Sequence, residues 1–212
     1  NGPRDLTLRW ALLLHDVAKG LPGIRGTTPD GYPNDHGHEK HSAEMTETIL
    51  TRLRYPRSFV RRVCWLVARH MRFAPMLINQ NNTLLRWIRS EAVSGSFRTE
   101  KEMAEAFAQL KEVFLADMGA TWAGVLREPV MEEARRLGDE AVEIACEKMP
   151  VHTSDLHVRG SEVETLLAES RNLAVGDAMK YLLLRVQSGS LPNERDMLLE
   201  VLRKRMCRAQ SL

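Results

Sequence analysis

Apolar residues at helical spacing are the feature that most limits the folds open to this chain. They recur every three or four residues in segment after segment, which places them along one face of an α-helix. The alternating Val, Ile and Thr patterns typical of strands are almost absent, and hairpin turns of the Asp-Gly type are limited to Asp30-Gly31. The pattern therefore predicts an all-α protein.

The helical segments predict a bundle followed by a smaller helical region. We predict helices over residues 4–19, 39–54, 57–71, 82–93, 100–119, 128–148, 160–169, 175–188 and 192–207. A long loop rich in Gly and Pro, residues 20–38, separates the first two helices, and loops of this kind often carry function. The stretch 149–154 is the best candidate linker, so we predict one domain over 1–149 and a helical C-terminal appendage over 150–212.

Composition narrows the cellular setting and the classes of partner. The 212 residues include 30 Lys and Arg against 28 Asp and Glu, a net charge of +2, which excludes a polybasic tail or an acidic disordered region. Three widely spaced Cys residues argue against a disulfide framework or a thiolate zinc site. The longest aliphatic run, residues 11–14, is far shorter than the roughly 20 residues that a membrane span requires. We therefore predict a cytoplasmic protein with no membrane partner.

Three of the predicted helices carry an apolar stripe that ends in a residue able to bind a metal ion. The stripes end at His15, His70 and Asp117, each three or four residues beyond the last apolar member. Burying an imidazole or a carboxylate without a partner is costly, and one shared divalent cation would satisfy all three groups. Taken singly, a core-facing histidine such as His70 is more often a hydrogen-bonded core residue than a metal ligand. For Asp117, a buried carboxylate paired with Arg or a backbone N–H is as good an explanation as a metal ligand.

Two neighbouring residues extend this possible site. Asp16 follows His15, so on a helix their side chains lie about 100° apart and can flank one ion. His38 begins the helix after the Gly/Pro-rich loop and can reach the same ion from the loop side. Mixed imidazole and carboxylate ligands suit Zn, Mn, Fe, Co or Ni, with Mg suited to a carboxylate-rich site.

The segment Leu13-Leu14-His15-Asp16-Val17-Ala18-Lys19 resembles the L-L-H-D-[IV]-[GA]-K helix of the HD superfamily of metal-dependent phosphohydrolases. Other segments resemble the C-terminal half of bacterial tRNA nucleotidyltransferases and poly(A) polymerases, the CCA-adding enzymes with an HD domain. These segments are residues 9–11, 37–39, 52–56, 66–70, 115–117, 180–183 and 189–195. The resemblance covers nearly the whole chain and implies an HD-domain helical bundle followed by a helical tail.

The resemblance also implies a divalent metal site and a reaction. The core ligands would be His15, Asp16 and Asp117, with His38 and His70 as extra ligands or phosphate contacts. Asp16 would orient or deprotonate a water, and Lys19 would neutralise phosphate charge, unless it is simply a solvated lysine at a helix end. The implied reaction is hydrolysis of phosphomonoesters or 2′,3′-cyclic phosphodiesters, with RNA ends, tRNA or nucleotides as substrates.

Two departures from the family pattern affect these expectations. The nucleotidyltransferase head, with its Gly-Gly-rich motif and paired catalytic Asp residues, is absent from the sequence, so we expect no nucleotide addition by this chain alone. An HD domain also uses an earlier His, and none of the residues before His15 is a His. Either the chain is a fragment of a longer protein, or its site works with one ligand fewer.

A run of arginines between residues 52 and 72 predicts a surface that binds RNA. Such a surface can follow an RNA backbone, although a solvated helix face is an equally good explanation. Phe73 and Trp87 are candidates to stack on bases, but the helical spacing of Trp87 from Leu84 suits the core better. The proposed phosphate contacts are Arg57, Arg61, Arg62, Arg69 and Arg72.

Three functions are open at this stage. The first is a metal-dependent phosphohydrolase. The second is a non-catalytic body that holds tRNA for a nucleotidyltransferase head in the parent chain. The third is a degenerate HD domain that serves only in oligomerisation.

Overall fold

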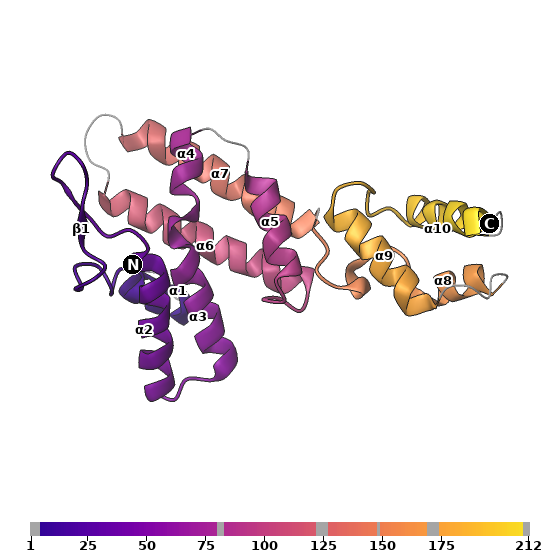
Figure 1. The fold of residues 1–212 in the computed structure, drawn as a ribbon, viewed down its shortest axis with the longest axis horizontal. Helices are drawn as coiled ribbons and strands as arrows, with labels where there is room; N and C mark the ends of the chain where they lie inside the picture. The colour runs from indigo at the N-terminus through magenta and orange to yellow at the C-terminus, as the bar shows by residue number, and fades with distance from the viewer. Residues whose placement is uncertain (1–4, 80–82, 122–126, 148, 169–173, 210–212) are drawn as a thin grey trace. The chain divides into compact units, whose positions relative to one another are not determined.

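The computed structural model describes residues 5–79, 83–121, 127–147, 149–168 and 174–209, whose regular secondary structure is helical except for one short hairpin (Figure 1). The all-α prediction is therefore confirmed. The chain divides into two compact units: unit 1 contains Asn1–Asn82 and Ala106–Glu140, and unit 2 contains Thr83–Glu105 and Ala141–Leu212. The division into domains at residue 149 stays a prediction. None of the described helices is both long and apolar enough to cross a membrane.

Unit 1 is built from the first helices of the chain and from parts of two long ones. Its elements are α1 (Leu6–Leu14), β1 (Gly26–Thr27), β2 (Pro33–Asn34), α2 (His38–Arg52), α3 (Arg57–Arg69), the 3₁₀ helix η1 (His70–Arg72) and α4 (Ala74–Asn79). It also includes α6 (Glu100–Thr121) from residue 106 and α7 (Arg127–Glu147) up to residue 140. Helix α3 packs against both α1 and α2.

Helix α1 is shorter than predicted, and the prediction that it reaches residue 19 is wrong. It begins at Asp5, whose carboxylate accepts a hydrogen bond from the Thr7 N–H at 2.8 Å, and it ends at Leu14. Beyond Leu14 the backbone forms turns, because the Ala18 N–H donates to Ser42 Oγ of α2 at 3.2 Å. His15 and Asp16 therefore do not share one continuous helix.

The Gly/Pro-rich loop contains a small hairpin that the sequence analysis does not predict. Strands β1 and β2 pair antiparallel, with Gly26 opposite Asn34. Gly31 has a φ of 85° in the turn between them, a conformation that glycine adopts without strain. Two-residue strands are too short for any alternating pattern, and the six-residue α4 is likewise missing from the predicted elements.

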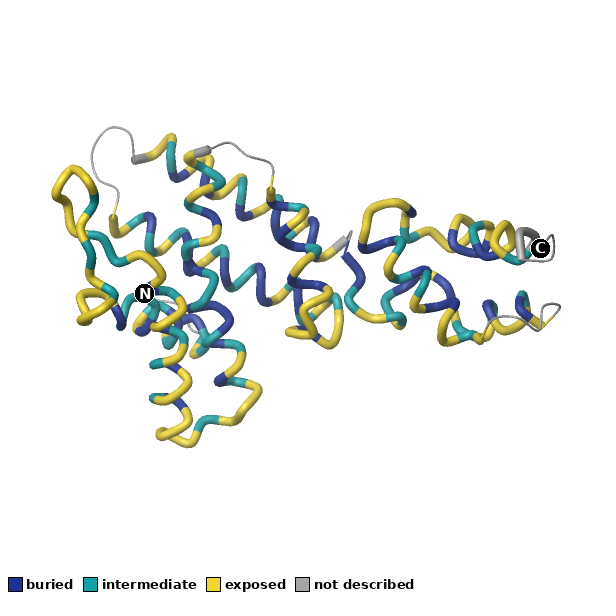
Figure 2. The backbone as a smooth tube through the Cα atoms, viewed as in Figure 1, coloured by how far each residue is buried: buried dark blue, intermediate teal, exposed yellow. Residues whose placement is uncertain are grey.

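The core of unit 1 lies on the apolar stripes that the sequence predicts. Val63, Leu66 and Val67 of α3 are buried without exposed surface, and the Trp65 ring meets Phe107 of α6 edge-on at 5.4 Å. Figure 2 shows buried and exposed segments alternating along the helices, as expected of amphipathic helices. These stripes direct the polar residues that follow them toward the interior.

Both aromatic candidates for base stacking are buried, which excludes that role for Phe73 and confirms the core position favoured for Trp87. Phe73 has no exposed surface, and its ring packs 5.1 Å from that of Phe114 in the core of unit 1. Trp87 of unit 2 is only 4% exposed and donates its indole N–H to Glu91 at 3.1 Å. Burial removes the ring faces that a base would need.

Unit 2 contains the remaining helices around a second apolar core. Its elements are α5 (Leu84–Val93), the 3₁₀ helix η2 (Thr153–Asp155), α8 (Gly160–Leu167), α9 (Val175–Gln187) and α10 (Arg195–Ala209), with the ends of α6 and α7. Helix α10 begins at Arg195 rather than 192, because Asn193 accepts from His157 N–H and donates to Asp155 O. The predicted helix limits at residues 4, 82, 148 and 169 lie outside the described residues.

The predicted linker 149–154 is anchored within unit 2. Met149 is 1% exposed, and the Gln187 side chain donates to Pro150 O at 3.0 Å. Asp155 Oδ2 accepts from the backbone N–H groups of Val151 and His152. These contacts give the stretch a fixed path, unlike that of a loose connection.

The end of α2 provides a test of local backbone strain. The helix ends in a Schellman motif, in which Tyr55 N–H donates to Leu50 O and Arg54 N–H donates to Thr51 O. Arg54 takes the left-handed position with a φ of 61°.

We expect Arg54→Gly to raise the free energy of unfolding by about 0.5–1 kcal/mol, measured by urea denaturation, because glycine adopts this φ without strain. Glu47→Gly, at an exposed position inside the helix, should lower it by about 1 kcal/mol, and equal losses in both variants would contradict the strain.

Candidate metal centre

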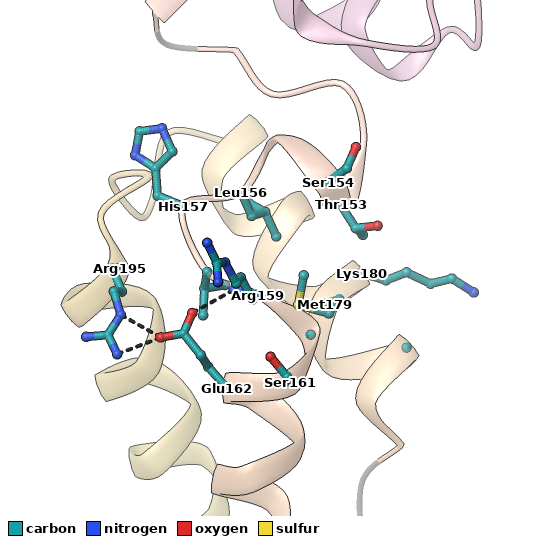
Figure 3. A pocket seen from close by; sticks show the side chains of 13 residues that line it. Thr153, Ser154, Leu156, His157, Arg159, Ser161, Glu162, Met179, Lys180 and Arg195 are labelled. Carbon is teal, nitrogen blue, oxygen red and sulfur yellow. Dashed lines mark hydrogen bonds and ion pairs between the residues drawn. The ribbon is translucent and has the colours of Figure 1, made fainter.

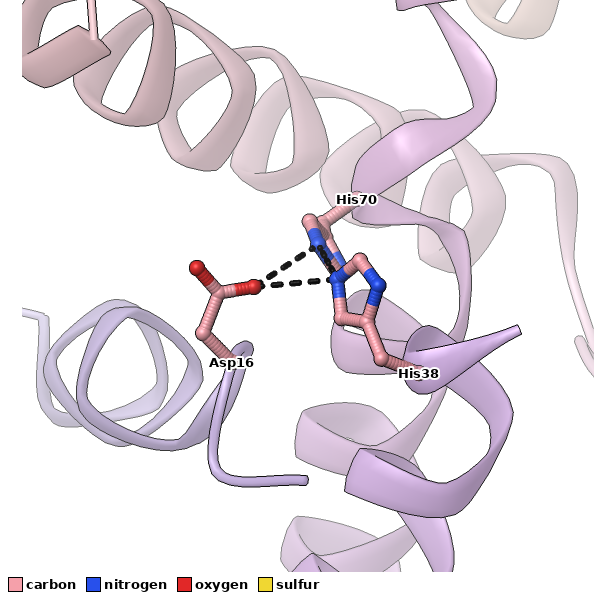
Figure 4. A group of neighbouring side chains, drawn as sticks. All are labelled: Asp16, His38 and His70. Carbon is pink, nitrogen blue, oxygen red and sulfur yellow. Dashed lines mark hydrogen bonds and ion pairs between the residues drawn. The ribbon is translucent and has the colours of Figure 1, made fainter. Parts of the chain in front are cut away.

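The structure brings all five predicted ligand residues into one cluster in unit 1. His15 follows the end of α1, Asp16 lies in the next turn, His38 begins α2, His70 begins η1, and Asp117 lies in α6. They form two overlapping groups whose ligand atoms lie within 4.8 Å of one another: Asp16, His38 and His70, and His15, Asp16 and Asp117. Figure 4 shows the first group, with the Asp16 carboxylate pointing toward both imidazoles.

Asp16 is the residue that the two groups share. Its Oδ1 lies 3.0 Å from His38 Nε2 and 3.6 Å from His70 Nε2. Its Oδ2 lies 3.3 Å from His15 Nε2, and the same His15 nitrogen lies 3.5 Å from Asp117 Oδ1. One carboxylate therefore presents a different oxygen to each group.

The three imidazoles are oriented by the same backbone contact. In each, Nδ1 lies within hydrogen-bond distance of the carbonyl oxygen three residues earlier. Because a carbonyl only accepts, Nδ1 carries the hydrogen, and in the neutral ring Nε2 offers its lone pair to the cluster. The bonds run from His15 to Leu12 (2.9 Å), from His38 to Asp35 (2.8 Å) and from His70 to Val67 (2.7 Å).

This arrangement concentrates hydrogen-bond acceptors in a buried place. His38 Nε2 and His70 Nε2 lie 3.2 Å apart, and both residues are buried. Asp16 Oδ1 is buried beside them, and despite its short distance to His38 no donor reaches it with the geometry of a hydrogen bond. Converging lone pairs are unfavourable unless a proton or a cation lies among them. The nitrogen and oxygen donors fit a divalent ion such as Mn, Fe, Co, Ni or Zn, and the carboxylates also suit Mg.

The cluster shifts the pKa values of its own members. A hydrogen bond with Asp117, and then one with Asp16, raises the pKa of His15 to about 10. The same contact lowers the pKa of Asp117. Burial opposes ionisation of Asp16, but its contacts with His15, with His70 and with the Lys19 ammonium outweigh this effect and lower the pKa of the carboxyl. Without metal the centre therefore holds a proton on His15, which a cation would displace.

Lys19 lies at the edge of this cluster. Its ammonium is 2.7 Å from Asp16 Oδ2, and its side chain is 40% exposed. The lysine is therefore bound to a ligand residue rather than solvated at a helix end. Its contact with substrate phosphate stays a prediction.

The predicted RNA-contacting arginines differ in their surroundings. Arg57 and Arg61 are exposed and lie one turn apart on α3, and Arg72 is exposed in η1. Arg62 and Arg69 are partly buried, and the Arg69 guanidinium lies 5.4 Å from the Trp65 ring centre. Arg62, Arg69 and Arg72 each make contacts within the protein, so Arg57 and Arg61 are the better-placed candidates to meet a phosphate backbone.

A large cavity in unit 2 has different chemistry. It has a volume of about 1040 Å³, and none of the five ligand residues lines it (Figure 3). Its one carboxylate, on Glu162, is held by Arg195 at 2.6 Å, and the Lys180 side chain points away from the centre of the cavity. The cavity therefore lacks the combination of imidazoles and carboxylates that makes the cluster in unit 1 a candidate metal centre.

Two residues that support the centre were missed by the sequence analysis. Ser42 holds the turn after α1 through Ala18, and Asp35 supplies the carbonyl that orients His38. A weak signal for Asp35 was available, because it lies just before Gly37, the residue that precedes α2 and has a φ of 79°. Such a glycine marks a backbone that turns sharply just before a helix.

A helical bundle with imidazoles and carboxylates gathered at one internal point defines a class of metal-binding helical domains. The chain belongs to the HD domain family, which matches residues 2–120. This match confirms the resemblance on which the predicted fold and site depend.

Among characterised proteins, the chain is similar to a tRNA nucleotidyltransferase and to multifunctional CCA proteins. It is 34% identical over 183 residues to an A-adding tRNA nucleotidyltransferase of Deinococcus radiodurans, across 84% of this chain and 37% of that protein. It is 46% identical over 52 residues to a multifunctional CCA protein of Janthinobacterium sp. (strain Marseille), across 24% of this chain and 11% of that protein. The chain thus spans no more than 37% of the length of these relatives. No solved structure matches it.

The proton on His15 makes a testable contribution to stability. The pKa of about 10 lies above the ordinary value of 6.5, so this proton stabilises the metal-free fold fully below pH 6.5, and the contribution is lost as pH rises through about 10. We expect the free-energy difference between the parent and His15→Gln to shrink by about 1–2 kcal/mol over that range. Urea denaturation with a chelator measures it, and a difference that does not vary with pH would contradict the assignment.

Proposed function

We propose that this chain is a metal-dependent phosphohydrolase domain that cleaves phosphomonoesters or 2′,3′-cyclic phosphodiesters at RNA ends or in nucleotides. The observation that carries the proposal is the convergence of three imidazole Nε2 atoms and two carboxylates around Asp16. Membership in the HD domain family supports the chemistry, and the named tRNA nucleotidyltransferase relative supports the RNA substrate class.

The chain itself supplies the donors for a divalent cation. The residues that would hold it are His15, Asp16, His38, His70 and Asp117. When bound, such an ion lowers the pKa of a coordinated water and polarises a phosphoryl oxygen. The two overlapping ligand groups use different oxygens of Asp16, so the cluster has enough donor atoms for one metal ion or for two.

The remaining roles follow from the charges around Asp16. Its lowered pKa keeps this carboxylate ionised, which suits a ligand and a residue that orients water. The same low pKa makes it a weak acceptor for the proton of that water. Lys19, bound to the outer oxygen of Asp16, would face a phosphate that reaches the cluster and would offset its negative charge.

Substitution of Asp16 tests this function directly. We expect purified protein to contain a transition metal by elemental analysis and to hydrolyse 2′,3′-cyclic AMP or AMP in the presence of Mn²⁺, Ni²⁺ or Co²⁺. Asp16→Asn should lower both the metal content and, by at least about 100-fold, kcat/KM. Asp139→Asn, which changes an exposed carboxylate paired with Lys111, should leave both unchanged.

Two results would exclude the phosphohydrolase. One is a folded protein that takes up no divalent metal, as judged by calorimetry. The other is hydrolysis that persists unchanged in Asp16→Asn, because a contaminating enzyme would then be its source.

A second function, a non-catalytic body that binds tRNA, is favoured by the position of the arginines. Arg57 and Arg61 lie on the exposed side of α3, and α3 leads directly to His70. The helix is about 20 Å long, enough to follow several backbone phosphates. In this function the chain would hold tRNA for a nucleotidyltransferase head elsewhere in the parent protein.

Reversal of the two exposed charges tests RNA binding. We expect the double variant Arg57→Glu/Arg61→Glu to weaken tRNA binding and to reduce the slope of log affinity against log salt by about one for each lost phosphate contact. Fluorescence anisotropy over a salt series measures both. The matched control is Arg136→Glu, an exposed residue of α7 paired with Glu133. An equal loss in the control would indicate only a nonspecific charge effect.

A further inference from the structure

His38 differs from the other two histidines of the cluster in how its orienting carbonyl is held. The carbonyls that orient His15 and His70 belong to Leu12 and Val67, which lie in the last turns of α1 and α3. Those helices fix the carbonyls in place. The carbonyl that orients His38 belongs to Asp35, which precedes α2 and lies outside any helix.

The side chain of Asp35 supplies the support that a helix gives elsewhere. Its Oδ1 accepts from the Gly20 N–H at 2.9 Å and from Arg25 Nε at 2.8 Å. Gly20 directly follows Lys19 in the segment that leaves Asp16. The Asp35 side chain is only 11% exposed, whereas that of Arg25 is 47% exposed.

Asp35 therefore joins the two chain segments that carry opposing ligands. Its carboxylate holds the segment that leaves Asp16, and its carbonyl accepts from both the backbone N–H and the Nδ1–H of His38. A change at Asp35 acts on the Asp16 side and on the His38 side of the cluster at once. The Arg25 guanidinium neutralises the carboxylate and fixes its direction.

The geometry points to Asp35 as a positioning residue that, with Arg25, holds His38 with Nε2 toward Asp16. In counting His38 as a metal ligand, this inference rests on the proposed function. Groups that orient a ligating histidine commonly change metal affinity or activity by about 10–100-fold when removed. An effect of that size distinguishes positioning from an ordinary surface ion pair, which contributes little.

The test is Asp35→Ala in the full chain, read out first without metal. In ¹⁵N NMR of the metal-free parent, His15 should appear doubly protonated, because its pKa is raised to about 10, whereas His38 and His70 should show the tautomer with hydrogen on Nδ1. In Asp35→Ala, we expect His38 alone to become a mixture of tautomers, and the Gly20 amide to exchange faster with solvent. Calorimetry with Mn²⁺ should then show affinity reduced by about 10–100-fold.

Two companion variants separate positioning from a general effect. Asp35→Asn keeps an oxygen that can accept from Gly20 and Arg25, so we expect it to restore the tautomer and most of the affinity. Asp30→Ala changes an exposed carboxylate in the same hairpin loop and should behave as the parent. If Asp35→Ala fails to fold, Arg25→Ala removes the ion pair at its exposed partner and should still broaden the His38 tautomer signal.

The inference is overturned if His38 keeps a single Nδ1–H tautomer in both Asp35→Ala and Arg25→Ala. It is also overturned if His38 and His70 lose their tautomer together, since Asp35 would then support only the fold. These NMR results need neither metal nor substrate. Failure of the proposed function, seen as a parent protein without metal uptake or hydrolysis, is therefore distinguishable from failure of this inference.

Discussion

Unit 1 is organised around the carboxylate of Asp16, which three imidazole nitrogens approach; those of His38 and His70 bring lone pairs, a contact that is unfavourable without a proton or a cation. The nitrogens face inward because each Nδ1–H is already committed to a carbonyl three residues earlier. Leu12 and Val67 lie among the last four residues of their helices, where carbonyls lack a partner within the helix. The same bonds that satisfy these helix ends therefore aim His15 and His70 at Asp16, and the negative ends of two helices further favour a cation there.

This explains why helix ends matter more to the centre than helix interiors. If α1 continued past Leu14, Asp16 would follow the path of the helix, and the turn tied to Ser42 would not form. The stripe of α6 acts differently, since Asp117 lies within a long helix and is directed inward by Phe114 and its apolar neighbours. The centre thus combines one rigid contribution from a helix interior with several from chain segments that begin or end a helix.

The same distinction explains how much could be predicted from the sequence. Periodicity identifies the helices and directs His70 and Asp117 to the core, because it reports which face of a helix is buried. It cannot report that Ala18 bonds to Ser42, which shortens α1, or that Asp35 bonds to Gly20, since these contacts join residues far apart in sequence. Phe73 was wrongly expected to stack on a base because sequence does not show that the chain turns back into the core after His70.

The two candidate functions make different demands on the same helix. RNA binding needs only the exposed arginines of α3. It places no demand on the buried end of that helix, where apolar residues would serve equally well. The buried end instead carries His70, facing a second imidazole and a carboxylate at a cost that a purely structural core avoids. A cation would remove that cost, so the chemistry of the interior favours a bound cation, which the proposed hydrolysis requires. An RNA strand along Arg57 and Arg61 would approach the cluster from the side of α3. Binding by α3 and hydrolysis at its end are therefore compatible, and together they would favour RNA ends over free nucleotides as substrates.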